Sequence, residues 1–487
     1  YYEATLSDKV TLIVSQCVSD MRRSVYNIMD FIMKRTSRSI ISLVLMALTL
    51  LLSACLVDDG GLADPTATPA PFFPPTAMIT QDPLVPLNPT PTPNLTNPNP
   101  IRITELEYLQ EDTEVLIMAK LFNTLSDAIL RDVHLDIQAL DAQGNRIAQQ
   151  RTSFRYLFPL ETTGLVQEFE LNSGLEIASV EVRVVDGLID RGLKYTQPLT
   201  IQNTSAFRIG NDYSVTGWLS NADGYTYTQV KLNAIAYNDK GQIVGGGQAN
   251  FDFVPEKDQV GFNIRVNSRR GEVVDHVDVH PWITSYSASL EGGTWWDSIK
   301  KVEWNFVIDQ YNQLAGGALL ENQTDQMLIE TFYILTVSDA DNRVCQATNG
   351  YYDVIWADEN VVYAPAPLQL PEECVGQTVD LVIVPGEFGE FPINYNPLET
   401  SQAAFADDNH VSVSVINNLN AEVSQSRVYV VLRNPNGRIV GGGYQTTQAI
   451  HSGSSLNITV PVAYLGSIDD LTITAFASLP FGVEFGQ

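Results

Sequence analysis

The sequence contains few of the side chains that carry most enzyme chemistry and most metal binding. Its 487 residues include four cysteines and five histidines, and the cysteines form no C-x-x-C pair. No Ser-His-Asp or Cys-His arrangement is recognisable, and there is no G-x-S-x-G, P-loop or dinucleotide-binding fingerprint. We therefore expect a protein that is not an enzyme and that uses no cofactor.

Positive charge is also scarce. The chain has 28 Lys and Arg against 57 Asp and Glu, which gives a formal net charge of −29 at pH 7. Such a charge disfavours nucleic acid as a partner, and it disfavours direct adhesion to anionic lipid head groups. Two interpretations stay open: a preference for cationic or neutral partners, and an acidic secreted surface with no particular partner.

The apolar run at residues 40–52 is too short for a membrane span, which needs about 20 apolar residues. Lys34, Arg35 and Arg38 precede this run, and the small residues Ser53 and Ala54 follow it. A basic segment, a short apolar segment and small residues, in this order, predict a secretory signal and therefore export.

The end of that signal, Leu-Ser-Ala-Cys at residues 52–55, resembles the bacterial lipobox. The resemblance implies a lipoprotein signal peptide at residues 33–54 and lipidation of Cys55, whose thiolate is a good nucleophile. The protein would then be exported and lipid-anchored to the bacterial cell membrane, facing the outside of the cell. A plain signal peptide with an incidental cysteine and an uncleaved signal anchor are the alternatives.

The segments on either side of the signal differ from it in character. Residues 1–32 fit poorly, because Met33 begins a complete signal by itself; they are an upstream or spurious segment, or a long cytoplasmic region that starts at Met21. Residues 55–100 contain 12 of the 25 prolines. We expect them to form a lipid-anchored, Pro/Thr-rich linker that is semi-rigid and largely extended.

The rest of the chain repeats one pattern. Residues 213–247 match residues 409–443 without a gap, since Asn221 and Asn417, Gly241 and Gly437, and Gly247 and Gly443 are all separated by 196 positions. Two more divergent copies begin at residues 115–123 and 314–322. Within each copy apolar and polar residues alternate, which indicates half-buried antiparallel strands, and Asn-Asp-Lys-Gly at 238–241 indicates a hairpin turn.

These features predict an all-β fold: a tandem array of four immunoglobulin-like β-sandwich domains at residues 101–202, 203–290, 291–400 and 401–487. The order strand, Asn, strand, turn and strand resembles the FxLYD-type repeat, an immunoglobulin-like domain of exported bacterial and archaeal proteins. The family's Tyr-Asp position corresponds to four dipeptides here: Leu140-Asp141, Tyr237-Asn238, Val337-Ser338 and Arg433-Asn434. The resemblance implies no enzymatic activity. The Gly-Gly-Gly runs at 245–247 and 441–443 favour a bulge or a close approach of sheet edges over a phosphate site.

Two sets of residues are candidates for a functional site. On a strand, His276, Asp278 and His280 would share one face and could hold a divalent metal, although alternate residues lie nearly 7 Å apart and an ordinary solvated face is the alternative. Trp295 and Trp296 lie in a loop and could stack on sugar rings, or could pack at a domain junction.

Cys345 and Cys374 are expected to form a disulfide, because the exported location permits one and Cys55 is otherwise used. The sequence as a whole predicts a non-catalytic, lipid-anchored cell-surface protein for surface presentation, adhesion or envelope assembly. Its partners would be the membrane, through the lipid anchor, and envelope proteins or glycans. The alternative is a carbohydrate-binding or metal-dependent accessory lipoprotein.

Overall fold

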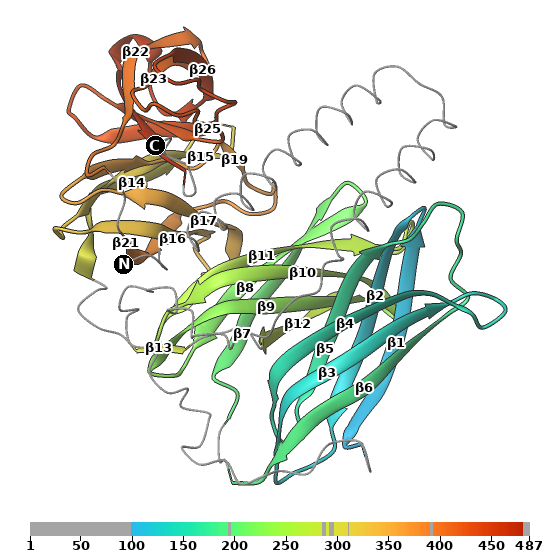
Figure 1. Cartoon of the computed structure of the whole chain (residues 1–487). Helices are drawn as coiled ribbons and strands as arrows, with labels where there is room; N and C mark the ends of the chain where they lie inside the picture. Colours follow the sequence, from blue (N-terminus) through green and yellow to red (C-terminus); the bar gives the residue numbers. More distant parts are fainter. Residues whose placement is uncertain are drawn as a thin grey trace, which may run out of the picture. The chain divides into compact units, whose positions relative to one another are not determined.

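The computed structural model describes residues 99–192, 196–284, 289–291, 297–309, 311–389 and 393–480. These residues form antiparallel sheets almost throughout (Figure 1), and the helical residues described among them are 297–298 and the short 3-10 turn Ile468–Asp470. The prediction of an all-β fold is confirmed. In the described part of the chain no helix is long and apolar enough to cross a membrane. The signal, Cys55 and most of the linker lie outside the described residues.

The strands fall into four groups along the chain, here called strand groups I to IV. Group I has two three-stranded sheets, β1-β2-β5 and β4-β3-β6. Its strands are β1 (Ile101–Glu111), β2 (Glu114–Asn123), β3 (Ile129–Leu140), β4 (Arg146–Leu157), β5 (Thr162–Glu170) and β6 (Ser179–Asp190). Alternate apolar residues of both sheets, such as Ile117 and Leu135, are fully buried in one core.

Group II repeats this arrangement, but its two sheets are joined into one through β10 and β11. Its strands are β7 (Leu199–Ile209), β8 (Asp212–Asn221), β9 (Tyr225–Tyr237), β10 (Ile243–Val254), β11 (Gln259–Ser268), β12 (His276–Ile283) and the short β13 (Ser289–Glu291).

Groups III and IV follow the same strand order. Group III consists of β14 (Ile299–Ile308), β15 (Gln313–Asn322), β16 (Met327–Ser338), β17 (Val344–Ile355), β18 (Asn360–Tyr363), β19 (Leu368–Gln369), β20 (Thr378–Val384) and β21 (Glu387–Gly389). Group IV consists of β22 (Leu398–Asp407), β23 (His410–Asn417), β24 (Arg427–Arg433), β25 (Ile439–Thr446), β26 (Ser455–Pro461), β27 (Ala463–Tyr464) and β28 (Thr472–Ser478).

A buried asparagine ends the second strand of every group. Asn123, Asn221, Asn322 and Asn417 are at most 2% exposed. In each case the side-chain amide donates to three backbone carbonyls, one at or before the start of the third strand and two at or after the end of the fourth, and its oxygen accepts a backbone N–H two residues on. One side chain therefore ties three segments of each group together.

The hairpin between the third and fourth strands has the same turn in every group. The side chains of Asp141, Asn238, Asp339 and Asn434 each accept the backbone N–H groups of the second and fourth residues that follow. In group III this position is Asp339, so the dipeptide that corresponds to the others is Ser338-Asp339. The expected alignment through Val337-Ser338 was wrong by one residue, because Asn342 takes the positive φ (59°) that glycine takes in the other three turns.

The two Gly-Gly-Gly runs lie at the start of β10 and β25, where the hairpin register shifts by one residue. A Cβ atom on Gly247 would overlap the carbonyl of Arg265, and one on Gly443 would overlap the carbonyl of Pro461. The glycines are therefore required where the fourth strand passes over the fifth, and the bulge and close approach predicted for them are confirmed.

Candidate functional site

The strongest recurring feature of the described residues is the buried junction between successive strand groups. At each junction the sheet that contains the second strand of one group contacts the sheet that contains the third and fourth strands of the next. The hydrophobic cores interlock there: Ile129 of group I belongs to the core of group II, and Met327 of group III belongs to the core of group IV. The groups are therefore joined by packing as well as by the chain.

The first junction places β2 and β5 against β9 and β12. Trp282 of β12 is 3% exposed and enters the core of group I, where its ring lies 4.8 Å from that of Phe154. Its indole N–H donates to Oγ1 of Thr163 at 2.8 Å. Asn233 accepts the backbone N–H of Val166 through its side-chain oxygen at 3.3 Å. Apolar insertion and hydrogen bonds thus act together across this junction.

An ion pair lies at the edge of the same junction. Nζ of Lys120 on β2 is 2.7 Å from Oδ2 of Asp278 on β12 and 4.0 Å from Oε1 of Glu105. The ammonium group also lies 4.6 Å from the ring centre of Tyr237. Burial opposes the charge of Lys120, but its hydrogen bonds and charge interactions with Asp278 and Tyr237 outweigh burial and raise the pKa of this lysine.

Burial shifts three other groups at this junction away from their ordinary pKa values. It raises the pKa of Tyr237 to about 12 and lowers the pKa of His280 to about 4. It also lowers the pKa of Lys231 to about 8. His280 packs against Gly164 of β5, where any Cβ would overlap the imidazole. The histidine is therefore neutral at physiological pH and serves as a packing group.

The structure does not bring His276, Asp278 and His280 together as the metal site that the sequence pattern offered. His276 stacks on Tyr237 with 4.9 Å between ring centres, Asp278 binds Lys120, and His280 is buried. Their ligand atoms do not form a cluster, because alternate residues of one strand are too far apart to share an ion. In this arrangement the three side chains take part in the junction, and a metal site here stays a prediction from the sequence.

The second and third junctions are formed by the equivalent sheets, but by different side chains from those of the first junction. Between groups II and III, the indole N–H of Trp218 donates to the carbonyl of Asn342 at 3.0 Å, and the backbone N–H of Gly261 donates to Thr336 at 3.1 Å. Between groups III and IV, Arg433 pairs with Glu303 at 2.6 Å. The middle glycine of each triplet also lies at a junction, Gly246 at the first and Gly442 at the third. A Cβ on Gly246 would lie 2.8 Å from Met118, and one on Gly442 would lie 2.7 Å from the carbonyl of Gly316.

Four tyrosines form a buried cluster where groups III and IV meet. Tyr333, Tyr352 and Tyr363 of group III and Tyr429 of group IV have ring centres 4.4 to 6.5 Å apart. Burial raises the pKa of each of these phenols, so all four stay neutral. The cluster serves as an aromatic core between the two groups.

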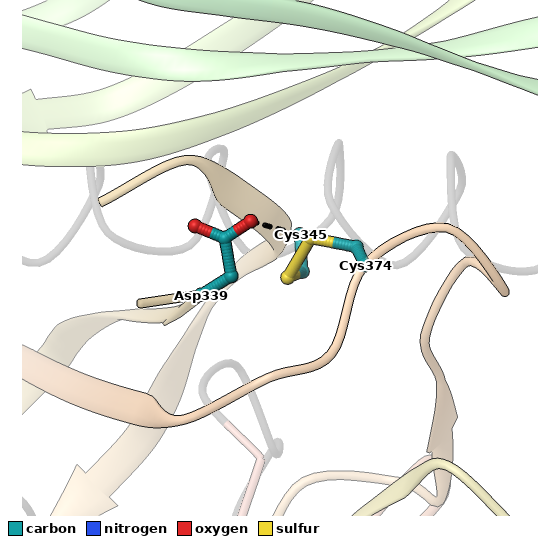
Figure 2. A group of neighbouring side chains, drawn as sticks. All are labelled: Asp339, Cys345 and Cys374. Atoms are coloured by element: carbon teal, nitrogen blue, oxygen red, sulfur yellow. Dashed lines mark hydrogen bonds between the residues drawn. A yellow bond between two sulfur atoms is a disulfide. The ribbon is translucent and has the colours of Figure 1, made fainter. Parts of the chain in front are cut away.

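Cys345 and Cys374 are joined by a disulfide, with their Cα atoms 5.5 Å apart. Asp339 lies beside them, as Figure 2 shows, and these three residues are the one close cluster of potential metal ligands found in the described part of the chain. Both sulfurs are used in the disulfide, and Asp339 pairs with Arg343 at 3.0 Å. The cluster is therefore structural: it holds the turn that contacts group II through Asn342.

Several residues that the sequence singled out lie outside the described residues: Cys55, Trp295 and Trp296. Conversely, sequence reasoning missed the junction role of Lys120 and Trp282. Trp282 follows the alternating residues 276–280. A large aromatic residue at the end of that strand was the one sequence feature that could have indicated a contact with another group. Lys120 lies at an outward position of β2, which a single copy of the pattern cannot distinguish from a solvated position.

The chain is distantly similar to solved structures of larger proteins. No protein-family model matches the sequence, and no curated protein matches it. A β-glucuronidase from glycoside hydrolase family 2 is similar over 51% of this chain and 25% of its own, with 10% identity and a TM-score of 0.13. A mutant of Salmonella alpha-2-macroglobulin is similar over 77% of this chain and 30% of its own, with 11% identity and a TM-score of 0.11. The chain thus spans less than a third of either protein, and similarity at this level carries no argument about function.

Proposed function

We propose that this chain is an exported, lipid-anchored, non-catalytic protein built from four immunoglobulin-like β-sandwich modules of the FxLYD type. Its role is to present a surface outside the cell, for adhesion or for assembly of the envelope. The modules correspond to strand groups I to IV, each with the same strand order, buried asparagine and hairpin turn.

The observation that carries this proposal is the repeated junction. Three times, the sheet that contains the second strand of one group packs against the sheet that contains the third and fourth strands of the next, through buried side chains such as Trp282, Thr336 and Tyr429. Burial on this scale couples neighbouring modules mechanically and resists their independent motion. Coupling of this kind suits a structural spacer that carries a binding surface away from its anchor.

The anchor rests on the sequence at residues 52–55 and on the proline-rich residues that follow. We would express the full chain in a bacterial host and label the cells with an alkyne analogue of palmitate. The chain is expected to incorporate the label and to be cleaved by protease added outside the cells. Cys55→Ser should abolish incorporation, whereas the matched variant Cys17→Ser should not. Labelling that survives Cys55→Ser would contradict the anchor.

Coupling between modules is tested separately, with a pair of substitutions that the repeat itself provides. A side chain on Gly261 would overlap Thr336 at the second junction, and the equivalent residue 196 positions later is Asn457. Gly261→Asn should therefore open that junction and expose the linker between groups II and III to limited proteolysis. Asn457→Gly should leave the proteolysis pattern unchanged. Equal resistance of both variants would show that the junction does not couple the modules.

A further inference from the structure

A groove of about 460 Å³ runs along one side of strand group I, between β1 and β6. It is lined by Ile103, Thr104, Glu105, Leu106, Val180, Glu181, Val182 and Arg183. Each of the two strands ends its own sheet, since the orders are β1-β2-β5 and β4-β3-β6 (Figure 1). A strand at the edge of a sheet leaves alternate backbone N–H and C=O groups outside the ladder. The groove therefore has an open strand edge on each side.

The corresponding gap is closed in groups III and IV by a side chain from the third residue of the first strand. Lys301 donates through Nζ to the carbonyl of Leu381 at 2.7 Å, and Thr400 donates through Oγ1 to the carbonyl of Ala475 at 2.9 Å. In group I the third residue of the first strand is Ile103, which has no donor.

The strand register shows that these positions are equivalent. The first residue of each of these strands pairs with the buried asparagine: Ile101 with Asn123, Ile299 with Asn322, and Leu398 with Asn417. The carbonyls in groups III and IV belong to Leu381 and Ala475, and the equivalent residue of β6 is Val182, which pairs with Ile137. Group I thus keeps open a gap that two sister groups bridge.

We propose that this groove binds an extended, basic polypeptide segment, which adds as a strand to the open edge of β1 or β6. The backbone edges would supply hydrogen bonds to any extended peptide, and the aliphatic floor of Ile103, Leu106, Val180 and Val182 would accept alternate side chains. This inference goes beyond the proposed function and does not depend on the lipid anchor.

The charge of the groove and of the chain favours a basic occupant. Glu105 and Glu181 line the groove, and their side chains are each 41% exposed. Arg183 is the one basic lining residue, and it pairs with Glu181. The whole chain carries a net charge of −29, which attracts a cationic segment and repels an acidic one. The lining residues include no aromatic ring, so the stacking that sugar recognition commonly uses is missing here.

The test uses the soluble chain from residue 56 onward, with every strand group retained, and a fluorescent eight-residue peptide of alternating Val and Lys. Saturable binding is expected by fluorescence anisotropy, with slower amide hydrogen exchange in β1 and β6. Ile103→Lys and Ile103→Thr, which copy groups III and IV, should each weaken binding by about tenfold or more. Ile103→Val, which leaves the gap open, should stay within about twofold of the parent. Thermal unfolding of each variant checks that group I stays folded.

Two control peptides separate strand addition from charge attraction alone. A peptide N-methylated at alternate residues cannot make the edge hydrogen bonds, and it should bind at least tenfold more weakly. A Val/Glu peptide should not bind. The proposal is overturned if the N-methylated peptide binds as well as the parent, if both donor-bearing variants bind unchanged, or if exchange slows only outside β1 and β6.

Discussion

Replacement of Asn123 tests whether the buried asparagine holds each strand group together. Its amide nitrogen lies 3.0 Å from the carbonyl of Ala128, 3.2 Å from that of Leu157 and 2.9 Å from that of Phe158, and its oxygen accepts the N–H of Leu125 at 3.0 Å. The side chain is fully buried, so water cannot replace these bonds in the folded state.

The size of the effect follows from the groups that lose a partner. The carbonyl of Phe158 keeps the N–H of Glu161, so Asn123→Ala leaves the carbonyl of Ala128 and the N–H of Leu125 as the most affected groups. An unpaired buried polar group costs about 1–3 kcal/mol, so two such groups predict a loss of about 2–6 kcal/mol for group I. Asn123→Asp should be worse at neutral pH, because a carboxylate would face three carbonyl oxygens, and it should partly recover in acid.

Hydrogen exchange with mass spectrometry at increasing urea measures this locally, because unfolding of a chain with several strand groups is not two-state. The matched control is Thr124→Ala, which removes one hydrogen bond to the carbonyl of Pro100 and should cost about 1 kcal/mol. If Asn123→Ala destabilised β2 to β5 by less than the control, or if Asp were tolerated as well as Ala at pH 7, the reasoning would be refuted.

Three further outcomes are expected. Gly247→Ala should destabilise group II by about 3 kcal/mol in urea unfolding, because its Cβ would overlap the carbonyl of Arg265. Burial raises the pKa of Glu359 to about 7, so stability present below pH 4.5 should fall by about 3 kcal/mol as the pH rises through 7, and Glu359→Gln should remove this dependence in melting curves recorded at a series of pH values. Replacing Cys345 and Cys374 together by serine should cost about 3 kcal/mol, since the disulfide closes a loop with a sequence separation of 29, and the loss should appear in melting of group III.

Two of these expectations have a direct control. For Gly241→Ala the new Cβ would have no atom within 4 Å, and the one unfavourable factor is the backbone φ of +72°. This variant should therefore lose about 1 kcal/mol of stability, less than Gly247→Ala. Reduction of the parent protein under denaturing conditions should reproduce the melting curve of the double serine variant. A Glu359→Gln variant that kept the parent's pH dependence would assign that dependence to another group.

The fold could be inferred from the sequence because its determinants are local and repeated. Alternation with period 2 identified the strands, and turn residues such as Asn238 and Gly241 identified the hairpins. The separation of 196 positions between Asn221 and Asn417 showed that the pattern recurs. The divergent third group was aligned one residue away because Asn342 replaces the glycine that marks the turn elsewhere. A positive φ is a property of the backbone that the residue type indicates only on average.

Contacts between groups were decided by the tertiary structure alone. Residues 276–280 alternate as a solvated strand face would, and the tertiary structure alone shows that β2 and β5 pack against that face, where Asp278 pairs with Lys120. The open gap beside Ile103 likewise became visible only in the structure. The sequence shows that Lys301 and Thr400 stand where group I has Ile103, but it does not show that their side chains span two sheet edges. Periodicity reports which face of a strand points away from its own core, but it does not report what covers that face, because the covering residues lie far along the chain.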